Sequence, residues 1–369
     1  MGVSRELTDE APPNRTRWRA RHVASWVGTK DTVTGREGEH MASYGYSLMC
    51  ELHGPNELLA QASRAEEAGF DFITISDHFH PWLYTHHHSP YAWSVLGALA
   101  AQTTDVELVS LVTCPTIRYH PAIVAQKAAT VATMSGGRFR LGLGAGENLN
   151  EHVVGRGWPP AHIRHEMLEE AIEIMQALWA GGYYKHEGKH YTVHDARIFT
   201  LPAEPPPVYV AVSGSESIAL AARAGDGMVA TEPRRELTQE FDEAAGAGKP
   251  KYGQLAVSVD DDEARARRVA HDLFRFGMPG WKVQSELPNP VNFEAATAYV
   301  REDDVAEAVP CGTDVDRHVE AIEQWTRAGF DRIAVVALGN NDRFFEFWEQ
   351  QLHPGLEASA ATKAAAGVE

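Results

Sequence analysis

The sequence has few of the features that mark disulfide-stabilised or metal-binding proteins. Its 369 residues include three cysteines, Cys50, Cys114 and Cys311, and none of them forms a Cys-x-x-Cys pair. An odd number of widely spaced cysteines excludes a disulfide framework and is typical of a reducing compartment. We therefore expect a cytoplasmic protein. The run Thr85-His86-His87-His88 has no metal-site spacing, and consecutive histidines point in different directions, so we predict no metal.

Basic charge and long apolar runs are also scarce. Lysine and arginine total 33 against 51 aspartates and glutamates, which gives a formal net charge of −18. Binding to nucleic acid or to a membrane surface needs a basic patch, so we expect neither partner. No apolar run reaches the ~18–20 residues of a membrane span. The apolar content of 44% and charged content of 23% are typical of a globular protein.

The two ends of the chain differ from the rest. Residues 9–21 are rich in Arg and Pro, lack helical or strand periodicity, and contain no adjacent arginine pair before an apolar segment. We predict a disordered tail over residues 1–43, a single domain over 44–355, and a frayed alanine-rich tail over 356–369.

One local pattern recurs three times, in residues 56–76, 216–231 and 316–337. Each copy predicts an amphipathic helix, a glycine that ends it in the left-handed conformation, and a buried strand. Helices that alternate with buried strands indicate a parallel sheet. Further strands are predicted near Gly45–Cys50, Glu107–Cys114, Arg138–Gly142, Val208–Val212 and Leu255–Val259, and further helices over 91–103, 121–134, 161–179, 260–275 and 341–352.

About eight strands favour a (β/α)8 TIM barrel of the bacterial luciferase-like kind, with a doubly wound sheet as the competing fold. Two stretches with little periodicity interrupt the alternation. Residues 180–207 are predicted to form an excursion with a short hairpin. Residues 276–312 are predicted to be an insertion between the seventh and eighth strands.

The stretch of residues 71–82 carries the strongest sign of chemistry. A short apolar run, Phe72 to Ile75, leads directly into Asp77, His78 and Trp82. Active sites of parallel α/β folds lie at the carboxyl ends of strands. Glu51 follows the first strand and is therefore expected at the same mouth. An ordinary strand followed by a polar turn is the alternative.

Two later strand ends add candidate ligand contacts. Glycines at 142, 144 and 146 let a flat ring approach the backbone closely, and Glu147 follows them. Their spacing does not match the dinucleotide-binding fingerprint. Ser213, Gly214 and Ser217 open a helix whose free N–H groups form an anion site, although Glu216 would compete with a bound phosphate. A ligand-free glycine turn and a simple helix cap are the alternatives.

Four motifs, at residues 76–82, 114–122, 144–151 and 222–227, occur in an order that resembles a known family. The family is that of the luciferase-like, coenzyme F420-dependent oxidoreductases of the glucose-6-phosphate dehydrogenase type, and the resemblance covers roughly residues 44–355. It implies an α/β barrel, a homodimer, and a deazaflavin at the carboxyl ends of the strands. Two alternatives remain open, an FMN-dependent monooxygenase on the same barrel and a non-catalytic F420-binding protein.

The resemblance also implies residue roles. His78 matches the residue that exchanges the substrate hydroxyl proton, Trp82 flanks the reacting carbon, Glu147 lies near N1 of the deazaflavin, and Glu51 is a further pocket carboxylate. Leu111–Val112 matches a non-proline cis peptide behind the ring, and Glu216 and Ser217 fall beside phosphate contacts. The positions that match cofactor-holding residues are Asp77, Cys114, Ala145, Gly146, Asn150, Ser213 and Gly214.

The substrate pocket of the family is matched only in part. Thr231 matches, and Arg234 or Arg235 replaces one phosphate-binding lysine, but Gln284–Ser285 and Ala308 stand where two further cations are expected, with Lys282 nearby. Fewer cations weaken the binding of a phosphate dianion. The predicted substrate is therefore an alcohol or a sugar phosphate, and the direction of hydride transfer stays open.

Overall fold

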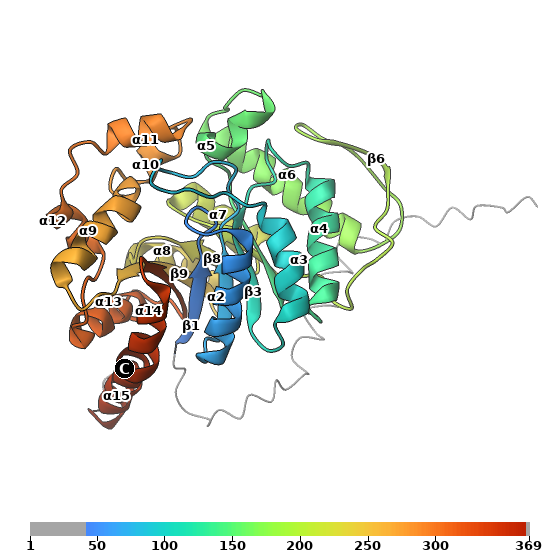
Figure 1. The fold of residues 1–369 in the computed structure, drawn as a ribbon. Helices are drawn as coiled ribbons and strands as arrows, with labels where there is room; N and C mark the ends of the chain where they lie inside the picture. Colours follow the sequence, from blue (N-terminus) through green and yellow to red (C-terminus); the bar gives the residue numbers. More distant parts are fainter. Residues whose placement is uncertain (1–41, 367–369) are drawn as a thin grey trace, which may run out of the picture. The chain divides into compact units, whose positions relative to one another are not determined.

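Eight parallel strands close into a barrel in the computed structural model, which describes residues 42–366 (Figure 1). In space each strand pairs with its neighbours in the order β1–β2–β3–β4–β7–β8–β9–β10 and back to β1. The predicted (β/α)8 barrel is confirmed and the doubly wound sheet is excluded. The strands are β1 (Ser43–Leu48), β2 (Phe72–Ile75), β3 (Glu107–Thr113), β4 (Phe139–Leu143), β7 (Val208–Ala211), β8 (Gly227–Ala230), β9 (Lys251–Ser258) and β10 (Arg332–Leu338).

Helices surround the barrel, and each predicted helix is present with its ends shifted by a few residues. The predicted helices are α2 (Pro55–Glu67), α3 (Ala92–Gln102), α4 (Pro121–Met134), α6 (Ala161–Trp179), α7 (Ser215–Ala224), α9 (Glu263–Phe274), α13 (Val315–Arg327) and α14 (Asn341–Phe347). The structure adds α8 (Arg235–Phe241), which the sequence did not predict. A π-helical turn, Trp348–Leu352, continues α14. No helix within residues 42–366 combines the length and the apolar character needed to cross a membrane.

The predicted C-terminal end of the domain needs correction. At the other end the first strand begins at Ser43, within one residue of the predicted domain start, while residues 1–41 of the predicted tail lie outside the described residues. The frayed tail predicted for 356–369 is wrong as far as Ala366, because helix α15 (His353–Ala366) occupies it. Alanine is the strongest helix former, and Leu356 is buried against the core, so this segment has both a propensity and an anchor.

Two of the three predicted glycine caps adopt the left-handed conformation. Gly69 has φ of 81° and Gly329 has φ of 90°. The prediction is wrong at Gly225, where φ is −98°. At that position the glycine serves close packing, because an added Cβ would lie 2.9 Å from the Ala221 carbonyl oxygen and 3.1 Å from Val210 Cγ2.

The interior of the barrel is filled by large side chains from successive strands. Buried residues that pack together there are Phe72, Val109, Tyr209, Val229, Tyr252 and Ala334. The Tyr252 ring lies 5.2 Å from that of Phe72 and 4.9 Å from that of Tyr209. These side chains close the barrel below its mouth, so chemistry is confined to the loops at the strand ends.

Gly253 in β9 marks a tight contact between the barrel and α13. A Cβ there would meet ring atoms of the buried Trp325 at 2.2–2.9 Å. We expect Gly253→Ala to lower the free energy of unfolding by roughly 1–3 kcal/mol, because the indole must shift within a packed layer. Gly97→Ala is the control, since Gly97 lies in α3 with no atom within 4 Å of an added Cβ. That change should stabilise the protein by ~0.5–1 kcal/mol. Denaturant unfolding measures both, and equal stabilities would contradict the packing argument.

Both predicted insertions are present. Strands β5 (Tyr184–Glu187) and β6 (Thr192–Ala196) form an antiparallel hairpin that arches away from the barrel beside α6 (Figure 1). Between β9 and β10 the insertion contains the short helices α10 (Trp281–Gln284), α11 (Pro290–Ala296) and α12 (Glu302–Ala308). It reaches the mouth of the barrel, because the backbone N–H of Asn148, just after β4, donates to the carbonyl of Ser285 at 2.9 Å.

Candidate active site

The loops after β1, β2 and β4 bring one imidazole and two carboxylates into contact. Glu51 follows β1, His78 follows β2 and Glu147 follows β4, and these strand ends open at one mouth because the strands are parallel. His78 Nδ1 pairs with Glu51 Oε1. His78 Nε2 lies 3.1 Å from Glu147 Oε1. Three of the four residues with predicted catalytic roles therefore form a single buried cluster, which we call the Glu51–His78–Glu147 triad.

Burial and charge act in opposite directions on the triad. Glu51 is 0% exposed and His78 is 15% exposed. Burial alone would lower the pKa of His78, but the charges of Glu51 and Glu147 raise it to about 9. Burial raises the pKa of Glu147, and its pKa stays above the usual range. For Glu51 burial also acts upward, but the attraction of His78 outweighs it and the pKa is lowered. The imidazole is therefore held as a cation at neutral pH.

Trp82, the fourth predicted catalytic residue, forms a wall beside His78. The indole meets the imidazole edge-on, with ring centroids 4.9 Å apart. Its other contacts come from the second insertion: Phe276 stacks on it at 4.8 Å and Phe293 meets it edge-on at 5.1 Å. The insertion thus fixes the indole, and with it one side of the imidazole.

The carboxylate of Asp77 accepts four hydrogen bonds from neighbouring side chains of the protein. It accepts hydrogen bonds from Trp93 Nε1 at 3.1 Å, Thr113 Oγ1 at 2.8 Å, Tyr119 OH at 3.1 Å and Arg118 Nη2 at 3.2 Å. A carboxylate offers about four lone-pair sites, so the side chain has none to spare. Cofactor binding by Asp77 remains a prediction, and these bonds limit it to the backbone.

Sequence reasoning missed two residues that position the triad. Ser76 Oγ donates to Glu51 Oε2 at 2.9 Å and accepts from the backbone N–H of Cys50 at 3.0 Å. Arg118 braces the turn before His78 by donating to the Asp77 carbonyl at 2.7 Å. Ser76 directly precedes Asp77 and His78, and Arg118 lies in the motif at 114–122. Both were therefore within segments already singled out.

The glycine strand packs closely against its neighbours, as its sequence predicts. A Cβ on Gly144 would meet Val112 Cγ2 at 2.8 Å and Cys114 Sγ at 3.4 Å. The peptide bond between Leu111 and Val112 is cis, as the family resemblance implies. The pairing of β3 with β4 shifts register between Ser110 and Thr113. A surface lined largely by backbone therefore lies beside the loop that carries Glu147, and it is formed by Val112, Cys114 and Gly144.

Several buried polar atoms around this surface have no hydrogen-bond partner among residues 42–366. They include Glu147 Oε2, Thr116 Oγ1 and Glu151 Oε1. A Cβ on Gly146 would lie 3.2 Å from Thr116 Oγ1 and 3.0 Å from Glu151 Cγ, so two of these side chains border the same turn. An unpaired buried polar atom costs about 1–3 kcal/mol. A flat ligand with a polar edge would satisfy them, and these residues therefore fit a deazaflavin or flavin ring.

In the turn predicted to bind phosphate, backbone N–H groups are hydrogen-bonded within the turn itself. Ser217 Oγ accepts from the N–H groups of Ser213 at 3.0 Å and Gly214 at 3.3 Å. Glu216 pairs with His165 at 3.2 Å. Arg234 lies beside the turn, because its Nη2 donates to the carbonyl of Ser213 at 3.2 Å. Phosphate binding here remains a prediction.

The residues predicted to contact substrate lie on the loops after β8 and β9. Thr231 and Arg234 are exposed on the β8–α8 loop, Arg235 is exposed at the start of α8, and Lys282 is exposed on α10. Arg234 Nε pairs with Glu232 at 2.9 Å. Gln284, at one position where a cation is expected, is buried and donates to the Gly277 carbonyl at 2.8 Å. Substrate contact by Thr231, Arg234, Arg235 and Lys282 stays a prediction.

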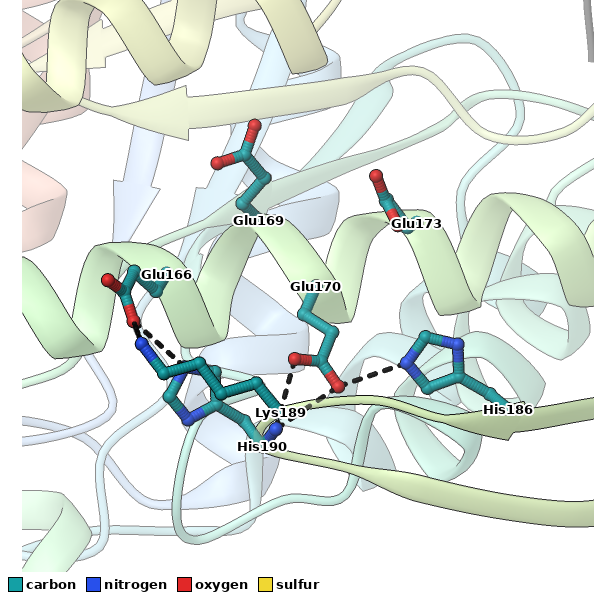
Figure 2. A pocket seen from close by; sticks show the side chains of 7 residues that line it. All are labelled: Glu166, Glu169, Glu170, Glu173, His186, Lys189 and His190. Carbon is teal, nitrogen blue, oxygen red and sulfur yellow. Dashed lines mark hydrogen bonds and ion pairs between the residues drawn. The ribbon is translucent and has the colours of Figure 1, made fainter.

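A hollow of about 390 Å³ lies between α6 and the hairpin and contains no member of the triad (Figure 2). Two hairpin histidines pair with glutamates of α6 there: Glu170 lies 3.0 Å from His186 Nε2, and Glu166 lies 3.2 Å from His190 Nε2. These pairs anchor the hairpin on α6. No group of three or more ligating side chains within the described part of the chain is placed to hold a metal ion.

The family model described as "Luciferase-like monooxygenase" matches residues 31–332. The chain belongs to this luciferase-like family.

Relatives agree with that assignment. The chain is 35% identical to the F420-dependent glucose-6-phosphate dehydrogenase of Beutenbergia cavernae over 86% of this chain and 98% of that protein. It is 35% identical to the enzyme of the same name from Segniliparus rotundus, over 85% and 98% of the two chains. Among solved structures, an F420-dependent secondary alcohol dehydrogenase in complex with an F420-acetone adduct matches with a TM-score of 0.80 at 28% identity, covering 86% of this chain and 99% of the other.

Proposed function

We propose that this protein is an F420-dependent oxidoreductase that transfers a hydride between a carbinol carbon, in an alcohol or a sugar phosphate, and the deazaflavin. The single observation that carries the proposal is the position of His78 between Glu51 and Glu147 at the strand ends, next to the surface around Gly144. The named activities of the relatives and of the alcohol dehydrogenase structure support it.

The residues of this chain supply orientation and proton handling. When bound, coenzyme F420 supplies the redox chemistry by accepting or giving the hydride. Val112, Cys114, Gly144, Ala145 and Gly146 would hold the ring against β3 and β4. His78 would exchange a proton with the substrate oxygen at Nε2, because Nδ1 faces the fully buried Glu51, whereas Nε2 lies on the side of Glu147 and the proposed ring surface.

Glu147 and Trp82 complete the site. Glu147 Oε2, buried and unpaired among residues 42–366, would meet the polar edge of the ring and exchange a proton with it. The indole of Trp82, fixed by Phe276 and Phe293, excludes water from one side of the imidazole.

A homodimer in the cytoplasm is the assembly that we propose. Apolar rings flank the hairpin at the surface, with Tyr183 69% and Phe199 77% exposed. Exposed apolar surface of this kind is typical of protein contacts. Sedimentation analysis should give twice the chain mass of 40.5 kDa, and a monomer at micromolar concentration would contradict the dimer.

Cofactor titration tests the proposed function directly. We expect the purified protein to bind F420 more tightly than FMN, and an alcohol or a sugar phosphate to bleach the F420 absorbance. Gly144→Ala should weaken F420 binding by roughly 10- to 100-fold, because the added Cβ would lie 2.8 Å from Val112 Cγ2. Gly157→Ala is the matched control, since no atom lies within 4 Å of its added Cβ.

Three results would contradict the proposal in different ways. Tighter binding of FMN would favour a monooxygenase. Tight F420 binding without bleaching by any alcohol or sugar phosphate would favour a protein that only carries the cofactor. Equal F420 affinities for Gly144→Ala and Gly157→Ala would place the ring elsewhere.

A further inference from the structure

Both ring nitrogens of His78 face carboxylate oxygens, and this arrangement sets the number of protons in the site. Nδ1 pairs with Glu51 Oε1, and Nε2 lies 3.1 Å from Glu147 Oε1. A neutral imidazole carries one N–H, so one of its nitrogens would present a lone pair to a carboxylate lone pair. The two contacts are compatible only when one further proton lies on the imidazole or on a carboxyl group.

Hydrogen bonds fix both carboxylates relative to the ring. Glu51 Oε2 accepts from Ser76 Oγ at 2.9 Å. Glu147 Oε1 accepts from Asn150 Nδ2. Asn150 Oδ1 in turn accepts from the N–H groups of Phe79 at 2.7 Å and His80 at 3.0 Å, which follow His78 directly. Asn150, 1% exposed, therefore ties Glu147 to the turn that carries His78.

The charged groups around the imidazole favour a retained proton. Glu51 faces it from the β1 loop and Glu147 from the β4 loop, while Arg118 approaches from the β3 loop and is paired with Asp77 and Glu151. Burial alone lowers the pKa of His78, and the two glutamates raise it to about 9. Arg118 acts in the opposite direction but is compensated by its own carboxylates.

We propose that Glu51, His78 and Glu147 hold one shared proton, which passes directly between His78 Nε2 and Glu147 Oε1 after each turnover, so that the site resets without exchanging a proton with solvent. This inference rests on the proposed function and specifies how its proton moves. The triad needs the same number of protons for alcohol oxidation and for carbonyl reduction.

In alcohol oxidation the protons balance as follows. With the hydride chemistry supplied by the bound cofactor, the hydroxyl oxygen would give its proton to His78 Nε2. Glu147 would release a proton to the cofactor side of the site, so the triad would gain one proton and lose one. The triad then holds its one proton on His78, as it does without ligand, and this proton moves from Nε2 to Oε1 before the next oxidation, so that a neutral His78 can again accept a hydroxyl proton. Carbonyl reduction runs through the same positions in the opposite order.

The inference is tested in the protein without cofactor or substrate. In ¹⁵N spectra of histidine-labelled protein, with the His78 signals identified from a His78→Asn variant, we expect both ring nitrogens to be protonated at pH 7 and to titrate near pH 9. Saturation of water should transfer to these N–H protons more slowly than turnover. A singly protonated ring at pH 7, or exchange faster than turnover, would overturn the proposal.

Glutamine variants of the two glutamates test which carboxylates hold the proton on His78. Glu147→Gln and Glu51→Gln should each lower the titration midpoint of His78 by roughly 1–3 pH units, because each removes an adjacent opposite charge. Glu170→Gln is the matched control, because Glu170 pairs with His186 in the hollow that contains no member of the triad, and the His78 midpoint should stay close to wild type. An unchanged midpoint in both Glu147→Gln and Glu51→Gln would overturn the proposal. Failure of F420 to bind would leave these results standing, so the two proposals fail separately.

Discussion

His78→Asn is expected to lower turnover by roughly 10²- to 10⁴-fold, the usual contribution of a general acid–base group. Asparagine keeps a polar group near the position of Nδ1 but cannot accept or release a proton at neutral pH. The cofactor surface around Gly144 belongs to β3 and β4, not to the turn after β2, so F420 binding should stay within a few-fold of wild type. Pre-steady-state absorbance changes of F420 measure the chemical step, and fluorescence titration measures the binding.

His80→Gln is the control for this comparison. His80 lies two residues further along the same turn, and its Nδ1 is 3.0 Å from the Leu149 carbonyl, so the change tests disturbance of the turn without removing the triad's proton. Turnover should remain within a few-fold of wild type. Equal losses in His78→Asn and His80→Gln would show that the turn's shape matters and that the imidazole proton does not.

The fold could be predicted from local patterns because most of them are consistent with the tertiary structure. Buried β-branched strands and glycine-capped helices are short-range signals. The three helix–glycine–strand segments, spread along the chain, were therefore enough to predict a parallel sheet. The errors came where two signals compete. After Pro354 the alanine-rich composition suggested a frayed end, but burial of Leu356 anchors a helix. At Gly225 the helix ends without a left-handed residue, and the glycine leaves room for close packing against Ala221 and Val210.

The site could be predicted only in part, because its geometry depends on long-range contacts. The order of strands in a parallel barrel placed Glu51, His78 and Glu147 at one mouth, and that much followed from the sequence. The sequence did not show that His78 bridges the two glutamates, that Asn150 ties Glu147 to the turn after His78, or that Arg118 braces Asp77 across 41 positions of sequence. These bonds join loops from different strands, and only their register in the closed barrel sets the distances.

The proton held by His78 should also make the stability of the fold depend on pH. The folded-state pKa of about 9 lies above the ordinary value of 6.5. Below pH ~6.5 both folded and unfolded chains bind the proton, and the stabilisation is complete. As the pH rises towards 9 the unfolded chain has lost the proton and the folded chain keeps it, so the free energy of unfolding should fall by about 3 kcal/mol.

Comparison with His78→Asn isolates this contribution. Lys127 acts against it at the upper end, because burial lowers the pKa of that ammonium to about 8 and its effect on stability therefore rises with pH. Lys127 is present in both proteins, so its effect cancels in the difference. Denaturant unfolding at intervals from pH 6.5 to 9 should show a smaller decline in His78→Asn than in wild type. Parallel curves would mean that the imidazole is neutral in the folded protein, and the charged triad at the mouth of the barrel would then be wrong.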